Sequence, residues 1–171
     1  MDNRNKHLDW WRPVFGENEK VLLAQVIESG FPNDGPLTTE FENQVAALIG
    51  VPYAIAVTSC TAGLYLSLMA LGIGAGDEVL VPDITFIATA NAVTMTGATP
   101  VLVDVDPKTF CIDITSASNR ITSRTKAIIP VHVSGRGADM QAISSLAQKH
   151  SLYVIEDAAE AFGSCQNKKP L

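Results

Sequence analysis

The sequence predicts an α/β fold in which a mostly parallel sheet is flanked by helices. From residue 53 onward, short apolar segments alternate with longer segments of helical character. This is the pattern of parallel strands joined by helices that cover both faces of a sheet. The chain has 171 residues, of which 47% are hydrophobic and 18% charged, and this suits a globular chain with one substantial core.

Two helices are predicted before the sheet begins. Apolar residues recur near helical spacing over residues 17–29, and Gly30 ends that pattern. A second helix is expected to begin at Thr39, because Thr39 and Glu42 have the spacing of a capping box. We expect this helix to continue to about Gly50.

The segments after residue 50 supply the predicted sheet and its covering helices. Strands are expected at residues 53–57, 78–81, 100–104, 127–131 and 152–155, and helices at residues 61–71, 86–96 and 139–150. The glycine-rich run at residues 72–76 follows a helix, so we interpret it as a helix-ending turn and not as a dinucleotide fingerprint. Residues 167–171 supply no helix cap or closing strand, and this predicts a chain that stops partway through its fold.

Charge and cysteine content exclude several classes of partner. A formal net charge of -6 and a pI near 4.9 argue against nucleic acid and anionic membranes, because phosphate groups attract clustered basic residues. Cys60, Cys111 and Cys165 are odd in number and widely spaced, which favours free thiols and no metal site. Residues 1–7 lack the apolar core of a signal peptide, and no apolar run reaches the roughly 18 residues of a membrane span. We therefore expect a cytoplasmic protein.

Residues 58–63, with the sequence Thr-Ser-Cys-Thr-Ala-Gly, are a candidate phosphate site. They are expected to join a strand to the start of a helix, where free backbone N–H groups and the helix dipole favour an anion. Alternatively, Ser59 or Thr61 only caps the helix. Cys60 could be an activated thiolate, although residues 62–66 lack the arginine that a phosphatase-like loop would need.

Phe86 is a candidate for contact with a cofactor ring. It follows the strand predicted at residues 78–81, at the carboxyl edge where open α/β sheets bind ligands. Its ring could lie flat on a heteroaromatic cofactor. The alternative interpretation is ordinary packing in the core.

Polar side chains follow two other predicted strands. Asp157 could remain ionised by facing a protonated ring nitrogen, since a buried carboxylate needs such a partner. Glu160, three residues later, could reach the same ligand. The alternative is a solvated acidic loop, to which we assign Glu156. His132 also ends a strand, and a structural role and a role in orienting a ligand are equally open for it.

Taken together, these segments resemble the DegT/DnrJ/EryC1/StrS family of sugar aminotransferases, which depend on pyridoxal phosphate (PLP). The resemblance runs from about residue 12 to residue 169. Five runs match the family in order and spacing: residues 59–64, 81–92, 97–101, 125–132 and 156–161. The first is similar to the family's phosphate loop, which usually reads Ser-Gly-Thr.

The resemblance implies PLP as the cofactor and a role for each candidate residue. Cys60 and Thr61 would bind the phosphate, Phe86 would stack on the ring, and Asp157 would face the pyridinium nitrogen. Glu160 stands where many members have a glutamine that bonds the phenolic oxygen, and the glutamate form resembles the branch that contains perosamine synthases. Cys60 replaces the loop's usual glycine, which adds bulk beside the phosphate.

The resemblance also implies the architecture. The expected fold is the fold-type I, aspartate aminotransferase-like fold, with residues 1–171 forming the N-terminal part of its large domain. Residues 1–36 would be the N-terminal helix and loop, and residues 37–171 the sheet portion, without the small C-terminal domain. An incomplete sheet is expected to expose an apolar face or edge and to promote association. Members of the family typically form dimers, so the resemblance implies a homodimer.

The implied activity is transfer of an amino group, in the family often taken from glutamate, to a nucleotide-linked 4-keto-6-deoxy sugar in nucleotide-sugar or polysaccharide biosynthesis. In the family, a lysine later in the chain forms the Schiff base with PLP. Neither Lys168 nor Lys169 matches its position. We therefore expect no catalytic residue within residues 1–171, and an inactive fragment.

Three alternatives remain open. A PLP-dependent sugar dehydratase of the same superfamily has histidine in place of the lysine. A truncated, non-catalytic product would bind PLP weakly or not at all. A different α/β binding protein would have to bring a phosphate loop, Phe86 and Asp157 together by coincidence.

Overall fold

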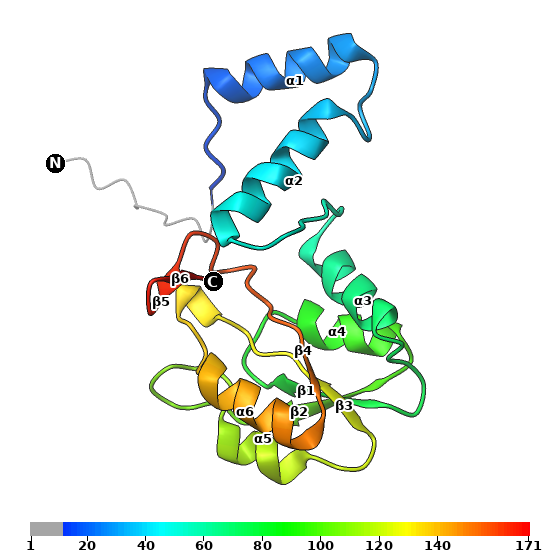
Figure 1. Ribbon diagram of the computed structural model, residues 1–171, viewed down its shortest axis with the longest axis vertical. Helices are drawn as coiled ribbons and strands as arrows, with labels where there is room; N and C mark the ends of the chain where they lie inside the picture. The colour runs from blue at the N-terminus through cyan, green and yellow to red at the C-terminus, as the bar shows by residue number, and fades with distance from the viewer. Residues whose placement is uncertain (1–11) are drawn as a thin grey trace, which may run out of the picture.

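The computed structural model describes residues 12–171, so the expectation about a signal peptide, which rests on residues 1–7, lies outside the described residues (Figure 1). The elements in chain order are α1 (Glu17–Ser29), α2 (Pro36–Ile49), α3 (Cys60–Ala70), β1 (Glu78–Pro82), α4 (Ala88–Met95), β2 (Thr99–Val103), α5 (Ile114–Arg120), β3 (Thr125–Ile128), the 3-10 turn η1 (Val133–Gly135), α6 (Met140–His150), β4 (Tyr153–Val154), β5 (Cys165–Gln166) and β6 (Lys169–Pro170). The predicted α/β class is confirmed.

The sheet has the strand order β2-β1-β3-β4, and all three pairings are parallel. Strand β1 lies in the middle, with Leu80 opposite Val101 on one side and opposite Ile128 on the other. All five residues of β1 are buried. Because the strands run in parallel, their carboxyl ends meet along one edge, which is where the candidate side chains were expected.

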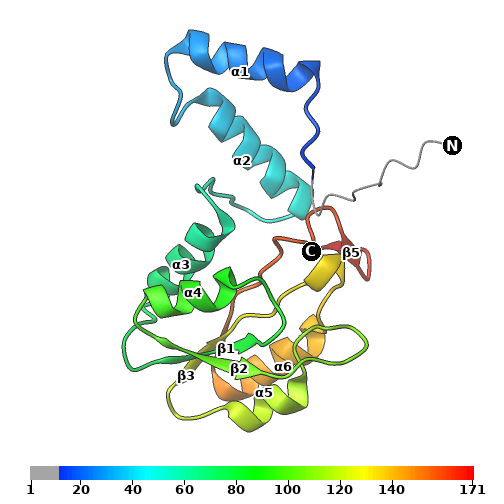
Figure 2. The same ribbon diagram turned by 180° about the vertical axis from the view of Figure 1, so that it is seen from behind.

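Helices cover both faces of the sheet (Figure 1, Figure 2). Successive side chains of a strand point to opposite faces. Accordingly Val79 and Val81 pack with Leu68 in the core beneath α3 and α4, whereas Leu80 packs in the core beneath α5 and α6. Leu68 and Leu80 are fully buried, and burial of one such side chain contributes about 2 kcal/mol to folding.

Helices α1 and α2 form an arm that extends from the sheet and its helices (Figure 1). No residue of α1 is buried, and Ala46 is the buried residue of α2. Helix α2 begins at Pro36, three residues before the predicted start, because proline is well suited to a first helical position. The predicted capping box is wrong: Thr39 lies inside α2, and the Glu42 Oε1 atom accepts a hydrogen bond from the Ala56 backbone N at 2.7 Å.

The strand predicted at residues 53–57 is absent from the structure. Within residues 12–171 no strand pairs with this segment, and Tyr53 and Ile55 are 84% and 81% exposed. An alternating apolar pattern indicates a half-buried strand only where a neighbouring strand can satisfy its backbone groups. Here the Ala56 backbone N is instead bonded by a side chain of α2.

The structure also contains short elements that the sequence analysis missed. Helix α5 has seven residues, too few to show helical periodicity. Strands β5 and β6 form an antiparallel hairpin whose turn has Asn167 and Lys168 at φ 51° and 65°. The expectation that residues 167–171 contain no strand is therefore wrong. Among the described residues, no helix combines the length and apolar character that crossing a membrane requires.

The glycine-rich run at residues 72–76 follows α3 and precedes β1, as predicted. Gly72 and Gly76 have φ values of 73° and 93°, in the left-handed region that favours glycine. They let the chain reverse between a helix and the central strand.

Glu78 fastens the start of β1 to the loop before β3. Its Oε2 atom accepts a hydrogen bond from Thr122 Oγ1 at 2.5 Å, and its Oε1 atom accepts one from Arg124 Nε at 2.9 Å. The Thr122 bond, followed by the Arg124 bond and charge, lowers the pKa of the Glu78 carboxyl below its ordinary value of 4.5, against the opposing effect of burial. The ionised form is therefore the one that the fold stabilises.

Replacement of this carboxylate is expected to weaken the fold above pH 4.5. Glu78→Gln should lower the free energy of unfolding by about 1–2 kcal/mol at pH 7, since it removes the charge from two hydrogen bonds. Because the folded pKa is lowered, this difference should disappear as the pH falls through that pKa. Urea unfolding at several pH values measures it. The control Glu17→Gln, in the exposed pair with Lys20, should cost less than about 0.5 kcal/mol, and equal losses for both variants would contradict the assignment.

Candidate cofactor site

Three segments meet at the carboxyl edge of the sheet: the start of α3, the loop from β1 into α4, and the chain that follows β4. Hydrogen bonds to one carboxylate connect them, because Asp157 is bonded by Cys60 from α3 and by Thr89 from α4. The site therefore draws on residues that are up to 97 positions apart in the sequence.

The backbone fixes Asp157 as an extension of the sheet. Asp157 forms a parallel bridge with Val131, its backbone N donates to the Pro130 carbonyl at 2.9 Å, and its carbonyl accepts from the His132 backbone N at 3.1 Å. The residue is only 5% exposed. Its position is thus set by strand pairing and not by a free loop.

Three donors satisfy the Asp157 carboxylate. Its Oδ2 atom accepts from Thr89 Oγ1 at 2.7 Å. Its Oδ1 atom accepts from the Ala159 backbone N at 3.3 Å and lies 3.7 Å from the Cys60 sulfur. These bonds offset the cost of burying a carboxylate. They rule out the alternative of a solvated acidic loop for Asp157.

The start of α3 supports both interpretations of the candidate phosphate loop. Ser59 is the N-cap, and its Oγ atom accepts from the Ala62 backbone N at 3.1 Å. Within residues 12–171, no acceptor bonds the N–H groups of Cys60 and Thr61. Two donors at the positive end of an 11-residue helix remain for an anion.

Cys60 is not an activated nucleophile. Burial, and then the charge and hydrogen bond of Asp157, raise the pKa of the Cys60 thiol above its ordinary value of 9.0. The thiol is therefore protonated at neutral pH, while reactive cysteines have lowered pKa values. Its role in the structure is that of a weak donor to Asp157.

Phe86 lies between β1 and α4, and its side chain is 73% exposed. The alternative that it is ordinary core is wrong. The ring is free to receive a flat ligand, and the residue before it, Thr85, is linked to Asp157 through Thr89. Phe86 is thus adjacent in the sequence to Thr85, where the series of hydrogen bonds that ends at the Asp157 carboxylate begins.

Glu160 is not joined to this group in the structure. Its exposed carboxylate accepts a hydrogen bond from the Ser134 backbone N at 2.6 Å through Oε2. The contact ties the turn after Asp157 to the 3-10 turn η1. Among the described residues, no hydrogen bond connects Glu160 with Asp157.

His132 has a structural role. It is fully buried, and its Nδ1 atom accepts from the Ala138 backbone N at 3.1 Å. The hydrogen of the neutral ring must therefore be on Nε2, which lies 2.9 Å from Glu156 Oε2. Both ring nitrogens are used within the protein. Glu156, which was expected in a solvated loop, is 48% exposed and is also the partner of this buried histidine.

Thr85 and Thr89 are members of the site that the sequence analysis missed. Thr89 is fully buried, and its hydroxyl lies 2.8 Å from that of Thr85. The signal that could have found them is a pair of threonines four residues apart beside the candidate aromatic residue. Threonine is common enough at helix starts that this pair does not stand out without the contact to Asp157.

The donor set fits PLP, the cofactor that the resemblance implies. Two unbonded N–H groups at a helix start suit a phosphate, a buried carboxylate suits a protonated ring nitrogen, and the exposed ring of Phe86 suits the face of a heteroaromatic ring. These groups belong to one cluster at the carboxyl edge of the sheet.

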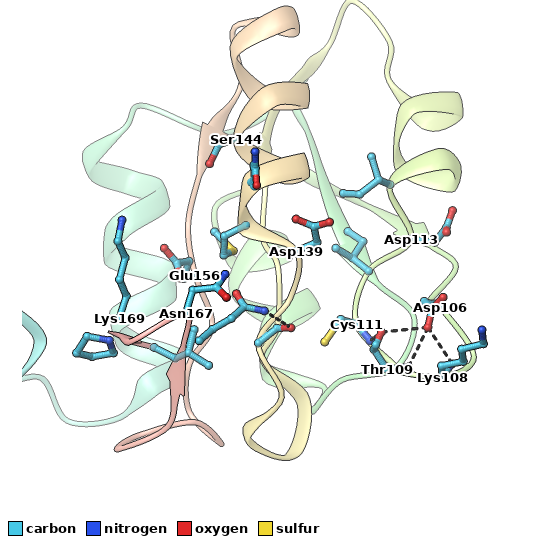
Figure 3. A pocket seen from close by; sticks show the side chains of 18 residues that line it. Asp106, Lys108, Thr109, Cys111, Asp113, Asp139, Ser144, Glu156, Asn167 and Lys169 are labelled. Carbon is cyan, nitrogen blue, oxygen red and sulfur yellow. Dashed lines mark hydrogen bonds between the residues drawn. The ribbon is translucent and has the colours of Figure 1, made fainter.

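A hollow of about 1070 Å³ lies elsewhere, between α6, the loop after β2 and the β5–β6 hairpin (Figure 3). Asp113, Asp139 and Glu156 are spread along its wall and are not gathered (Figure 3). Cys60, Thr89 and Asp157 do not line it. The candidate residues thus lie at the carboxyl edge of the sheet and outside this hollow.

Known proteins resemble this chain over almost all of its length. The model of the DegT/DnrJ/EryC1/StrS aminotransferase family matches residues 13–171. The spore coat polysaccharide biosynthesis protein SpsC of Bacillus subtilis is 45% identical over 161 residues, which are 94% of this chain and 41% of SpsC.

Two solved structures agree with this. The structure of DesV from S. venezuelae superposes with a TM-score of 0.87 at 39% identity, over 91% of this chain and 42% of DesV. The PLP form of Spr1654 from Streptococcus pneumoniae superposes with a TM-score of 0.88 at 32% identity, over 92% of this chain and 44% of Spr1654. The chain thus spans less than half the length of these relatives. The part of the fold that it contains is an incomplete fold-type I domain. The match of the family model over residues 13–171 shows that the chain belongs to the DegT/DnrJ/EryC1/StrS aminotransferase family.

Proposed function

We propose that these residues form the PLP-binding part of an aminotransferase that acts on a nucleotide-linked 4-keto-6-deoxy sugar, with glutamate as the amino donor. The observation that carries the proposal is the Asp157 carboxylate, held beside the start of α3 by Cys60 and Thr89. In this assignment residues 1–36 are the N-terminal helix and loop, and residues 37–171 are the sheet portion of the large domain.

Each residue of the cluster has a proposed task. The N–H groups of Cys60 and Thr61, with the Thr61 hydroxyl, bind the cofactor phosphate. Asp157 accepts a hydrogen bond from the ring nitrogen and keeps its proton in place, and Phe86 covers one face of the ring. When bound, PLP supplies an electron sink that stabilises negative charge beside the amino nitrogen.

Glu160 is proposed to bond the phenolic oxygen of the cofactor. Its carboxylate is exposed, and it is bonded to a backbone N–H of an exposed turn residue, Ser134. A rotation of the Glu160 side chain can replace the hydrogen bond from Ser134 with a hydrogen bond to a ligand. A glutamate at this position resembles the perosamine synthase branch. The name of SpsC, a polysaccharide biosynthesis protein, supports a sugar product of that kind.

In the family's longer chains the Schiff-base lysine stands, by the resemblance, later than the position that matches residue 171. We therefore infer that the 171-residue polypeptide binds PLP without turning it over. The proposal also includes a second copy of the chain, because α1 presents exposed apolar side chains such as Leu23 and Ile27, 61% and 76% exposed, with no residue of α1 buried.

PLP binding is expected to depend on the carboxylate and on the helix start. Asp157→Ala and Thr61→Ala should each raise the Kd for PLP, by roughly 10-fold or more for Asp157→Ala, because a charge-assisted hydrogen bond is lost. Titration followed by absorbance and fluorescence measures this. Asp34→Ala, in the exposed loop between α1 and α2, is the matched control and should bind like the wild type. Absence of saturable binding by the wild type would refute the proposed function.

The isolated polypeptide should not carry out the half-reaction with glutamate. With PLP bound, addition of glutamate is expected to release no 2-oxoglutarate, since no lysine is proposed to act within residues 1–171 to move the proton that amino transfer requires. Stopped-flow spectra and analysis of released 2-oxoglutarate test this together. Formation of 2-oxoglutarate at one equivalent per chain would show that a group within these residues replaces the lysine.

The apolar side of α1 is expected to mediate association. Ile27→Lys should shift the sedimentation profile toward the monomer, because it places a charge on an exposed apolar helix face. Asn18→Lys adds the same charge at an exposed polar position of α1 and serves as the control. A wild-type chain that sediments as a monomer would contradict this part of the proposal.

A further inference from the structure

We propose that Thr89 is a positioning residue that orients the Asp157 carboxylate for the cofactor's ring nitrogen and couples it, with Thr85, to the loop that carries Phe86. The inference rests on the proposed function and assigns a task to two threonines that the scheme above leaves without one. It follows from the contacts of one buried hydroxyl.

The Thr89 hydroxyl has an unusual choice of partner. A threonine in a helix can bond back to the carbonyl three or four residues earlier, as exposed Thr94 does with Ala90 on the same helix at 3.1 Å. The Thr89 hydroxyl, fully buried, instead crosses to Asp157, 68 positions away, at 2.7 Å. It thus joins α4 to the end of the sheet at the cofactor site.

The direction of the hydrogen bonds follows from the number of hydrogens. Thr89 has one hydroxyl hydrogen and gives it to Asp157 Oδ2. The 2.8 Å contact between the two threonines must then use Thr85 as the donor. The chain therefore runs one way, from Thr85 through Thr89 to the carboxylate, and bonds aligned in this way strengthen one another.

The same residue also holds the loop of Phe86. The Thr89 backbone N donates to the Phe86 carbonyl at 3.1 Å, and Thr85 precedes Phe86 in the sequence. Thr89 is therefore bonded to the proposed stacking residue through its backbone and to the proposed ring-nitrogen partner through its side chain. A single residue sets the separation between these two groups.

The donors around Asp157 leave little freedom for the carboxylate. An ionised carboxylate offers about four acceptor positions. Thr89, Ala159 and Cys60 use three of them, with Thr89 on Oδ2 and the other two on Oδ1. About one position remains for a donor from a ligand, on the oxygen that Thr89 holds. Loss of the Thr89 hydroxyl would free the carboxylate to turn away from that donor.

The test compares PLP with its 1-deaza analogue, in which a carbon replaces the ring nitrogen. Thr89→Val keeps the shape of the side chain but removes the hydroxyl. It should weaken PLP binding by about tenfold and leave binding of the analogue unchanged, because the analogue cannot bond Asp157. Thr89→Ser keeps the hydroxyl and should restore the wild-type Kd for PLP. Thr94→Val, on the same helix but exposed and bonded only to its own helix, should change neither Kd.

The outcomes separate this inference from the proposed function. If the wild type binds PLP but Thr89→Val loses equal affinity for both ligands, or loses none, the positioning role is overturned and the PLP site stands. If the wild type binds neither ligand, both are overturned. Should Thr89→Val fail to fold, Thr85→Val, at a half-buried position before α4, decides the question. If Thr85→Val loses affinity for PLP alone, by a smaller factor than Thr89→Val is expected to, the result supports the series of hydrogen bonds. Equal losses of affinity for PLP and the analogue, or no loss for either, refute it.

Discussion

The parallel bridge between Val131 and Asp157 is the constraint on which the proposed cofactor site depends. It continues the pairing of β3 with β4 beyond the ends of both strands and thereby fixes an acidic residue at the carboxyl edge of the sheet. The contacts of Cys60 and Thr89 with the carboxylate follow, because α3 and α4 lie over the same face of the sheet (Figure 1). A loop could not hold a buried carboxylate in one orientation with the same accuracy.

Burial makes this carboxylate costly, and its surroundings are polar for that reason. Donors from a backbone, a hydroxyl and a thiol converge on Asp157, and the buried His132 fixes the neighbouring Glu156. The resemblance implies glycine at the position of Cys60 in most members of the family, so the thiol would distinguish this chain. Because the pKa of the thiol is raised, Cys60 adds a neutral donor to the site and not a second negative charge beside Asp157.

The sheet and the arm of α1 and α2 differ in how completely they are packed. Strand β1 is buried along its whole length, whereas α1 has no buried residue. Exposed apolar residues at Tyr53 and Ile55 continue this contrast into the segment before α3. The part of the chain that holds the candidate site therefore has a core of its own. Exposed apolar side chains nevertheless lie both on the segments that precede it and within it, as at Phe86 and Phe162, which are 73% and 66% exposed.

The sequence by itself determined the central strands, the long helices, the turn at residues 72–76 and the candidacy of Asp157 and Phe86, because these depend on patterns within about 15 neighbouring residues. Only the tertiary structure decided which candidates touch. It brought Thr89 into a hydrogen bond with Asp157, 68 positions away, and His132 into a hydrogen bond with Glu156. It also left residues 53–57 outside the sheet, although their pattern is that of a strand. The physical reason is the same in each case: a hydrogen bond needs its partner in place, and the partner's position is set by the fold and not by local sequence.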